Sequence, residues 1–231
     1  MKKMKRGIFL YMALIILPFI SIAQSNDFGA ELSVDYSHKL ARGFGFNIEA
    51  EARFKDNFSR YNKGAISAGL HYSLFRNQLK PIGMKIKIGA DYSLMSRLNK
   101  LDSYDWQHRL NAHLSISEKI GQFEISLRER YQCDWRDIAI YEYLPRMHLR
   151  TRLKLNYTPE QIPWEFFVSE EIFYRANHPR NNEFEELRTV LGATYLINTT
   201  NAITLYLKAS NEINKKSPDN FYALGLTYSF R

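Results

Sequence analysis

The sequence predicts an all-β protein, an antiparallel up-and-down transmembrane β-barrel of about ten to twelve strands. Three observations predict this fold. Apolar and polar residues alternate with a period of two along most of the chain after residue 24. The alternating segments run close to the length of about 9–11 residues that a tilted strand needs to cross a bilayer. Aromatic residues gather at the ends of these segments, where the interfacial girdles of a membrane barrel lie.

The composition is compatible with this fold and excludes several others. The chain has 231 residues, of which 45% are hydrophobic and 24% charged, with a mean hydropathy of −0.39. After residue 23, no stretch approaches the roughly 20 apolar residues of a membrane-spanning helix. The 15 Tyr, 15 Phe and 3 Trp argue against a disordered chain. A single cysteine, Cys133, excludes an internal disulfide framework and a zinc site built on several thiolates.

Residues 1–23 have the features of a cleaved secretory signal. A basic start with Lys2, Lys3, Lys5 and Arg6 precedes an apolar run, and the segment ends in the small-x-small pattern Ser21-Ile22-Ala23. The alternative is a membrane anchor, but the apolar run is short and contains Pro18. Residues 24–231 are therefore expected to form one mature domain. Removing the signal leaves 28 basic against 24 acidic residues, a net charge of +4 that does not suggest nucleic-acid binding.

Eleven segments carry the alternation, and no convincing amphipathic helix is found. The expected strands are 30–40, 44–54, 64–74, 84–94, 104–117, 122–133, 147–157, 164–174, 187–196, 202–210 and 221–230. Short connections are expected at 41–43, 76–82, 118–121, 158–163 and 197–201, with longer, polar ones between them. This alternation suits short periplasmic turns and longer outer loops. If Phe230 ends in the periplasm, the ten strands from Gly43 onward close an even-numbered barrel. The segment Ala30–Leu40 is then left over, to enter the lumen, pack at the rim or pair with another strand to make twelve.

The outward face should carry the aromatic girdle and an assembly signal. The expected girdle residues are Phe44, Tyr92, Trp106, Tyr157, Trp164, Tyr195 and Tyr228. The last strand carries apolar groups at every second position, Tyr222, Leu224, Leu226, Tyr228 and Phe230. This pattern resembles the C-terminal signal by which outer-membrane barrels are presented to the barrel assembly machinery, except that Arg231 follows the final aromatic residue.

The charged residues at the alternate positions are expected to line the lumen. The expected network is Glu49, Glu51, Arg53, Lys85, Lys87, Arg109, Glu124, Arg128, Arg130, Arg150, Arg152, Lys154, Glu165, Glu171 and Arg188. For the hairpin that turns near residue 160, opposed positions should sum to about 321, which places Arg150 opposite Glu171 and Tyr157 opposite Trp164. Paired charges would plug the lumen in place of a hydrophobic core. The basic excess over residues 128–154 leaves a narrow path for a small anion as the alternative.

The chain resembles an uncharacterised family of bacterial outer-membrane β-barrels known as domain of unknown function 2490. The resemblance covers essentially the whole mature chain. It rests on the sequences WQHRL at 106–110, LRERY at 127–131, LRTRLKL at 149–155, the strand with Glu170-Glu171-Ile172-Phe173, ELRTVLGATY at 186–195 and the terminal YALGLTYSF. The family implies a location in the outer membrane of a Gram-negative bacterium and no biochemical activity, so it supplies no catalytic residues.

An enzyme and a secreted soluble barrel that binds an apolar ligand are the alternatives. A lipid hydrolase needs an outward Ser beside an outward His, and His108 is expected to face outward without such a Ser, since Ser115 and Ser117 face inward. A rim protease would need Asp102, Asp105, His108 and Asp134 to meet. No catalytic set is therefore assigned.

No cofactor or metal site is expected, because the sequence lacks a His-x-His or similar ligand spacing. The expected partners are outer-membrane lipids, lipopolysaccharide and the assembly machinery. Basic residues of the outer loops suit lipopolysaccharide phosphates, namely Arg60, Lys63, Lys100, Arg136, Lys215 and Lys216. The oligomeric state is open, with a monomer expected.

Overall fold

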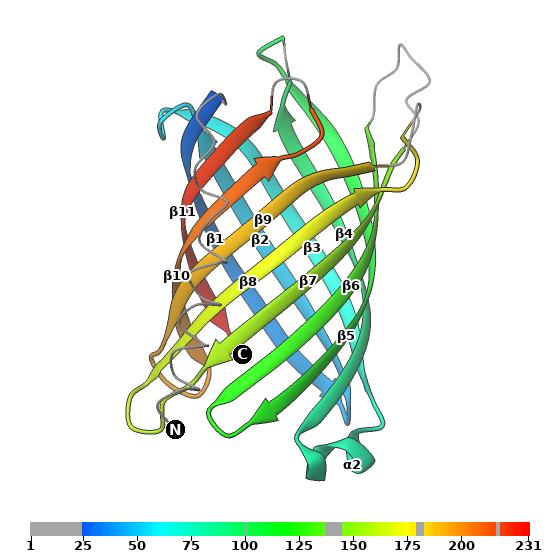
Figure 1. The fold of residues 1–231 in the computed structure, drawn as a ribbon, viewed down its shortest axis with the longest axis vertical. Coiled ribbons are helices and arrows are strands. Elements are labelled where there is room, and N and C mark those ends of the chain that lie inside the picture. Colours follow the sequence, from blue (N-terminus) through cyan, green and yellow to red (C-terminus); the bar gives the residue numbers. More distant parts are fainter. Residues whose placement is uncertain (1–24, 100, 137–144, 179–182, 216–217) are drawn as a thin grey trace, which may run out of the picture.

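Over the residues that the structure describes, the protein forms a closed β-barrel of eleven strands (Figure 1). The computed structural model describes residues 25–99, 101–136, 145–178, 183–215 and 218–231, so the predicted signal segment lies outside the described residues. The strands are β1 (Ser25–Ala41), β2 (Phe44–Lys55), β3 (Arg60–Leu74), β4 (Met84–Leu98), β5 (Tyr104–Ile120), β6 (Phe123–Arg136), β7 (Arg146–Tyr157), β8 (Trp164–Arg175), β9 (Glu183–Leu196), β10 (Asn201–Glu212) and β11 (Asp219–Phe230). Between β3 and β4 lie the short helix α2 (Arg76–Leu79) and the 3₁₀ turn η2 (Lys80–Ile82). No described helix is long and apolar enough to cross a membrane.

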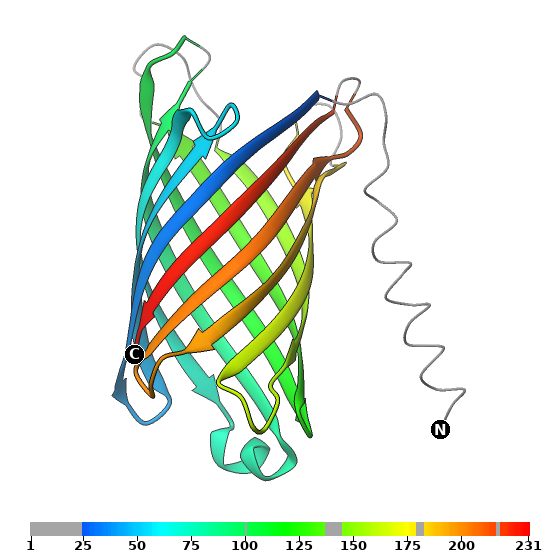
Figure 2. The same ribbon diagram turned by 90° about the vertical axis from the view of Figure 1, so that its left-hand side faces the viewer.

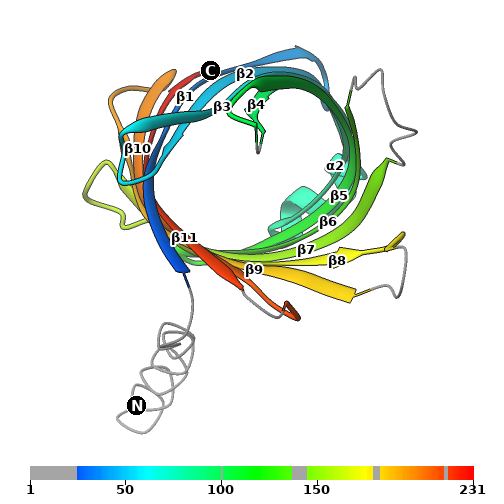
Figure 3. The same cartoon turned by 90° about the horizontal axis from the view of Figure 1, so that it is seen from above.

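The barrel closes through a parallel pair. Each strand pairs with its sequence neighbours in antiparallel fashion, and β1 and β11 complete the ring side by side in the same direction (Figures 2 and 3). The predicted fold class is confirmed, but the expectation of an even strand number is wrong. The segment left over in the sequence, Ala30–Leu40, forms most of β1. An odd number of up-and-down strands gives the first and last strand the same direction, so closure can only be parallel.

The connections divide between two ends of the barrel. One end, here called the turn end, carries residues 42–43, 75–83, 121–122, 158–163 and 197–200, together with α2 (Figure 1). The other, the loop end, carries residues 56–59 and 101–103. The predicted contrast between short connections at one end and long connections at the other holds only in part, because the turn-end connection with α2, residues 75–83, is longer than the loop-end connection 56–59. Several strands also run beyond their predicted bounds, with β5 reaching 17 residues.

The two faces of the wall are inverted relative to a soluble protein. Among the described residues, five hydrophobic residues are buried and fifteen polar or charged residues are buried. Leucine, isoleucine, valine and aromatic side chains are exposed along nearly every strand, including Leu32, Ile66, Leu114, Leu153 and Leu205. The apolar half of each alternation therefore faces outward, and the charged half faces the lumen. A polar interior takes the place of a hydrophobic core.

Gly225 on β11 makes room for one of these interior side chains. A Cβ at this position would lie 2.0 Å from the ring of Tyr206, which crosses the adjacent strand toward Glu31. Replacing Gly225 by Val should displace that ring and lower the free energy of unfolding by about 1–3 kcal/mol, because overpacking forces neighbours from their positions. Urea titration in lipid vesicles measures the effect. An unchanged free energy of unfolding would show that the wall yields there without cost.

Candidate functional site

The lumen is the candidate site, because it collects most of the predicted charge network. A cavity of about 540 Å³ lies inside the barrel, and its lining includes Glu49, Glu51, Arg53, Arg109, Arg130, Arg150 and Arg188. The remaining predicted residues, Lys85, Lys87, Glu124, Arg128, Arg152, Lys154, Glu165 and Glu171, occupy the same inward alternate positions of their strands. Side chains from β2 to β9 thus meet in one interior.

Glu171 on β8 is the centre of the larger ion-pair group. Its Oε1 accepts a hydrogen bond of 2.9 Å from Arg128 Nη2, and its Oε2 accepts one of 2.7 Å from Arg150 Nη2. Arg188 Nη1 lies 3.8 Å from the same Oε2. Only 5% of Glu171 and 5% of Arg150 is exposed. The guanidinium groups of Arg150 and Arg188 also stack over Phe173, at 4.3 and 4.5 Å from the ring centroid. One carboxylate therefore holds three arginines from β6, β7 and β9.

The predicted register of the β7–β8 hairpin is wrong by two residues. Arg150 lies opposite Phe173, Arg152 lies opposite Glu171, and Tyr157 lies opposite Phe166. A shift of two leaves every side chain on its original face, so the alternation cannot distinguish the two registers. Trp164 instead packs toward β9, with 5.1 Å between its ring centroid and that of Tyr195. The long side chain of Arg150 reaches Glu171 diagonally in spite of the shift.

Two residues that the sequence analysis did not assign to the lumen extend this group toward β5. Asp134 accepts hydrogen bonds from Arg109 Nε at 2.6 Å and from Arg109 Nη2 at 3.1 Å. Gln132 donates to Asp134 at 2.8 Å and accepts from Arg150 Nη1 at 2.6 Å. A continuous network thus runs from Arg109 to Glu171. The sequence predicts Asp134 at the rim, whereas the structure places it in the lumen. Asp134 continues the inward alternation of Arg128 and Arg130, and this alternation could have predicted its inward position.

A second ion-pair group fastens β1 to the rest of the barrel. Glu31 is 3% exposed and forms a salt bridge with Lys208 on β10. Its carboxylate also accepts from Tyr206 at 2.9 Å and lies 3.0 Å from Arg53 Nε. Arg53 pairs with Glu51, which in turn accepts from Lys63 at 3.1 Å. The sequence analysis missed Glu31, Tyr206 and Lys208, because it assigned no lumen positions to the first strand or to the tenth.

Basic groups exceed acidic ones on the wall of β6 and β7. Arg128 lies directly opposite Arg152, and Arg130 lies directly opposite Arg150. Arg130 Nη2 is 4.0 Å from Asp91, and no described carboxylate lies within 4.0 Å of Arg152. Like charges at opposed positions repel each other. This wall therefore offers a positive potential to the lumen that the described acidic residues only partly neutralise.

The predicted rim cluster does not assemble. Asp102 forms a salt bridge with Arg60, and Asp105 accepts from Asn99 at 3.0 Å. His108 faces outward, where its Nδ1 lies 2.5 Å from the Tyr92 hydroxyl and its ring stacks on Trp135. The expectation of no outward serine near His108 is wrong, because Ser96 occupies an outward position of β4 opposite Trp106. His108 is engaged with Tyr92 instead, so no nucleophile–base pair is formed among these residues.

The basic residues predicted to meet lipopolysaccharide have varied surroundings. Arg60 pairs with Asp102, Lys215 pairs with Glu212, and Lys63 points into the lumen rather than to a loop. Arg136 ends β6 at the loop end. Lys100 and Lys216 lie outside the described residues.

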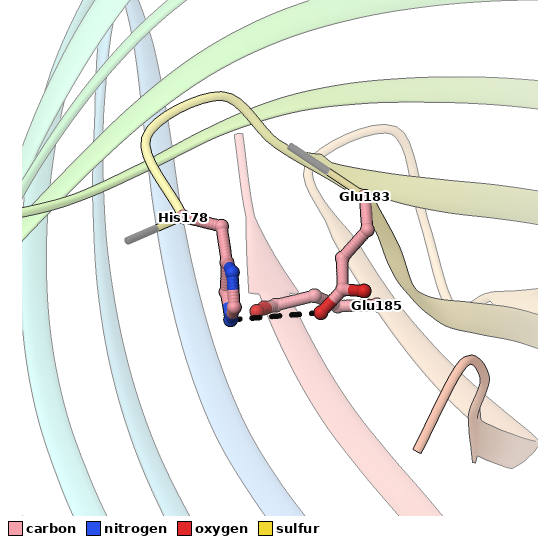
Figure 4. Close-up of side chains that lie close together, drawn as sticks. All are labelled: His178, Glu183 and Glu185. Atoms are coloured by element: carbon pink, nitrogen blue, oxygen red, sulfur yellow. Dashed lines mark ion pairs between the residues drawn. The ribbon is translucent and has the colours of Figure 1, made fainter. Parts of the chain in front are cut away.

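His178, Glu183 and Glu185 lie close together near the loop end, with ligand-type atoms within 4.8 Å of one another (Figure 4). The two side chains joined by the dashed line are His178 and Glu183, whose Nε2 and Oε1 atoms are 3.6 Å apart. Glu185 is already engaged, since it pairs with Arg175 at 3.0 Å and with His148 at 3.0 Å. Ion pairs therefore hold the side chains of this cluster in place.

The predicted girdle residues face outward, at more than one height. At the turn end, Tyr157 packs against Phe123 with 4.9 Å between centroids, and Tyr228 packs against Phe230 at 4.7 Å. Phe44 begins β2 at this end, whereas Trp106 lies near the loop end of β5. Tyr92 lies in the middle of β4, because that strand continues to Leu98. The outward residues of the predicted assembly signal lie on β11, which is paired with both β10 and β1.

The family model described as protein of unknown function (DUF2490) matches residues 29–221. The chain belongs to this family. A comparison with curated proteins gave no significant match for this DUF2490 member. Among solved structures, the DUF2490 chain is similar to the translocator domain of autotransporter NalP from Neisseria meningitidis, at 12% identity and a TM-score of 0.38, over 80% of this chain and 73% of that one. It is also similar to the anion-selective porin from Comamonas acidovorans, at 9% identity and a TM-score of 0.34, over 84% of this chain and 83% of that one.

Proposed function

We propose that this chain is a non-enzymatic β-barrel of the bacterial outer membrane whose lumen is closed to free diffusion by its ion-pair networks. The observation that carries the proposal is the inverted wall, with exposed apolar side chains outside and buried charges inside. A soluble protein that exposed such a surface would aggregate, whereas a bilayer covers it. The predicted secretory signal supports export, and the outward pattern of β11 supports recognition by the assembly machinery. Outer-membrane lipids and lipopolysaccharide are the partners that follow from this location.

The location is tested by fractionation of cells that produce the full chain. The protein should stay in the membrane fraction until detergent is added, and it should change its electrophoretic mobility when heated, because a folded barrel resists detergent unfolding. Release into the soluble periplasmic fraction without detergent would contradict the proposal and favour a secreted ligand-binding barrel.

Barrel size and the ion-pair networks together support a closed lumen. An eight-stranded barrel is filled by its side chains, and barrels of 16–18 strands leave an aqueous channel, so eleven strands leave a bore that long side chains can cross. The group around Glu171 lines the wall from β5 to β9, and the group around Glu31 joins β10, β1, β2 and β3, so the two groups together connect nine strands. A role in membrane structure or in surface contacts fits a barrel of this kind.

A narrow path for small anions is the second candidate function. It is favoured by one observation, the unpaired Arg152 beside Arg128 and Arg130 on the inward wall of β6 and β7. Arginines at such positions would attract anions and exclude cations of similar size.

Planar-bilayer recording distinguishes the two candidates. The purified barrel should give no conductance steps, or steps at least about tenfold smaller than those of a sixteen-stranded porin in the same salt, because an eleven-stranded barrel is narrower and charged side chains line its lumen. Small steps with a reversal potential that favours chloride, lost in Arg152→Gln, would establish the anion path. Large, non-selective steps would contradict the closed lumen.

A further inference from the structure

Four polar side chains interrupt the outward face of β6, β7, β8 and β9. We call Glu129, Thr151, Glu170 and Thr189 the outer polar belt. Thr151 lies opposite Glu129 and donates a hydrogen bond of 3.0 Å to its Oε2. Thr189 lies opposite Glu170 and donates one of 2.6 Å to its Oε1. Both glutamates occupy positions of the outward alternation, between Leu127 and Tyr131 on β6 and between Val168 and Ile172 on β8.

The belt lies near the middle of the membrane-facing wall. Glu129 follows Phe123 by six residues along β6, and Glu170 follows Trp164 by six residues along β8. Six residues of a strand tilted by about 40° rise by roughly 15 Å, which is close to the centre of an apolar band of about 25 Å. The two carboxyl groups therefore lie at similar heights, two strands apart.

The rest of the wall shows how unusual this region is. On β10, β11, β1, β2, β3 and β4, no described outward position carries a carboxyl group. Those strands present residues such as Leu207, Leu224, Val34, Ile48 and Leu70 instead. The carboxyl groups are thus confined to one side of the barrel, apart from Glu118 near the turn end of β5.

Lipid cannot satisfy these groups. Hydrocarbon offers no hydrogen-bond donor or acceptor, so a carboxyl group that faces it loses the bonds it would form in water. Each glutamate of the belt accepts one hydrogen bond from its threonine, and Glu170 Oε2 is buried without any partner. A surface that carries such groups at mid-membrane is better covered by protein than by lipid.

We propose that the outer polar belt is the centre of an interface between two copies of this chain within the membrane. The proposal rests on the membrane location proposed above. A protonated carboxyl group both donates and accepts hydrogen bonds, and a threonine hydroxyl that donates to it can still accept. Glu129 with Thr151 is the more accessible pair of the belt. It complements an identical pair across a two-fold axis, where Glu129 of one copy meets a belt group of the other.

The available area is sufficient for such a dimer. Four strands spaced by about 4.8 Å that cross an apolar band of about 25 Å at this tilt present roughly 600 Å² on each copy, or 1,200 Å² for the pair, which is at the lower limit of stable interfaces.

Disulfide trapping in native outer membranes tests the interface. Leu153→Cys in a Cys133→Ser background should form a cross-linked dimer under mild oxidation, because Leu153 is an exposed outward residue of β7 opposite Glu170 and leaves the belt intact. Ala68→Cys in the same background is the matched control, since Ala68 is an exposed, outward residue of β3, away from the belt. Glu129→Leu with Glu170→Leu, added to Leu153→Cys, should reduce the dimer about tenfold while the heat-dependent mobility shift shows that the barrel still folds.

The other outcomes are decisive as well. Equal cross-linking at residues 153 and 68 would show random collision, and a product of another mass would show a different partner; both overturn the dimer. A folded, membrane-embedded barrel without cross-linking at residue 153 overturns the dimer alone. A chain found in the soluble fraction overturns the membrane location first.

Discussion

Replacing Glu171 by Ala is expected to lower the free energy of unfolding by about 3–5 kcal/mol, the cost of breaking a buried ion pair by removing one partner. The substitution leaves Arg128, Arg150 and Arg188 without the carboxylate that they share. Urea titration in lipid vesicles, followed by tryptophan fluorescence, measures the change. Glu160→Ala is the matched control, because Glu160 is exposed in the connection between β7 and β8, and its loss should change the free energy by less than about 0.5 kcal/mol.

A double-mutant cycle shows whether Arg150 acts through Glu171. Removing both side chains should cost less than the sum of the single losses, by about 0.5–3 kcal/mol, because the second substitution breaks a contact that is already gone. Strictly additive losses would contradict the pairing, and a loss from Glu171→Ala as small as that from Glu160→Ala would remove Glu171 from the centre of the network.

Replacing Glu31 by Ala is expected to have a comparably large effect at the closing strand pair. Lys208 and Arg53 would lose their shared carboxylate, and Tyr206 would lose its acceptor. The free energy of unfolding should fall by about 3–5 kcal/mol. Because the three contacts join β1 to β10 and β2, limited proteolysis should release β1 before the other strands.

The conservative variant separates charge from hydrogen bonding at this position. Glu31→Gln keeps an acceptor for Tyr206 and removes the charge that balances Lys208 and Arg53, so its loss should be smaller than that of Glu31→Ala. Wild-type resistance of β1 to proteolysis in Glu31→Ala would show that backbone pairing with β2 and β11 suffices to hold the strand.

Much of the fold could be predicted because the alternation of apolar and polar residues is a local property of each strand. The stripes of β2, β4 and β7 give strand type, approximate bounds and the inward or outward face of each side chain. Strand partners are less visible. The place of β1 depends on its pairing with β11, at the other end of the sequence, and the alternation within β1 does not indicate this partner. The two-residue shift between β7 and β8 also leaves the alternation unchanged, because side chains alternate with a period of two.

The candidate site was predictable in character more than in detail. Arg128, Arg130 and Arg150 alternate with apolar residues along their strands, so their inward position could be predicted from the sequence. Asp134 and Lys63 were placed in loops because the strands were drawn too short, and the ion pairs of Glu31 depend on the closure of the ring. Glu129 and Glu170 could have been found from the sequence, because each is a carboxyl group at a position of the apolar alternation. A carboxyl group at such a position of a membrane barrel indicates a functional site.

The parallel closure also decides at which end of the barrel the first described strand begins. Ser25 lies beside Asp219 at the loop end, and Tyr36 lies beside Phe230 at the turn end. In an up-and-down barrel with an even strand count, both termini emerge on the same side. Here the start of β1 and the end of β11 emerge on opposite sides (Figure 2). A barrel held in the outer membrane with its turns in the periplasm would therefore place the start of β1 at the outer surface and the end of β11 at the periplasmic surface.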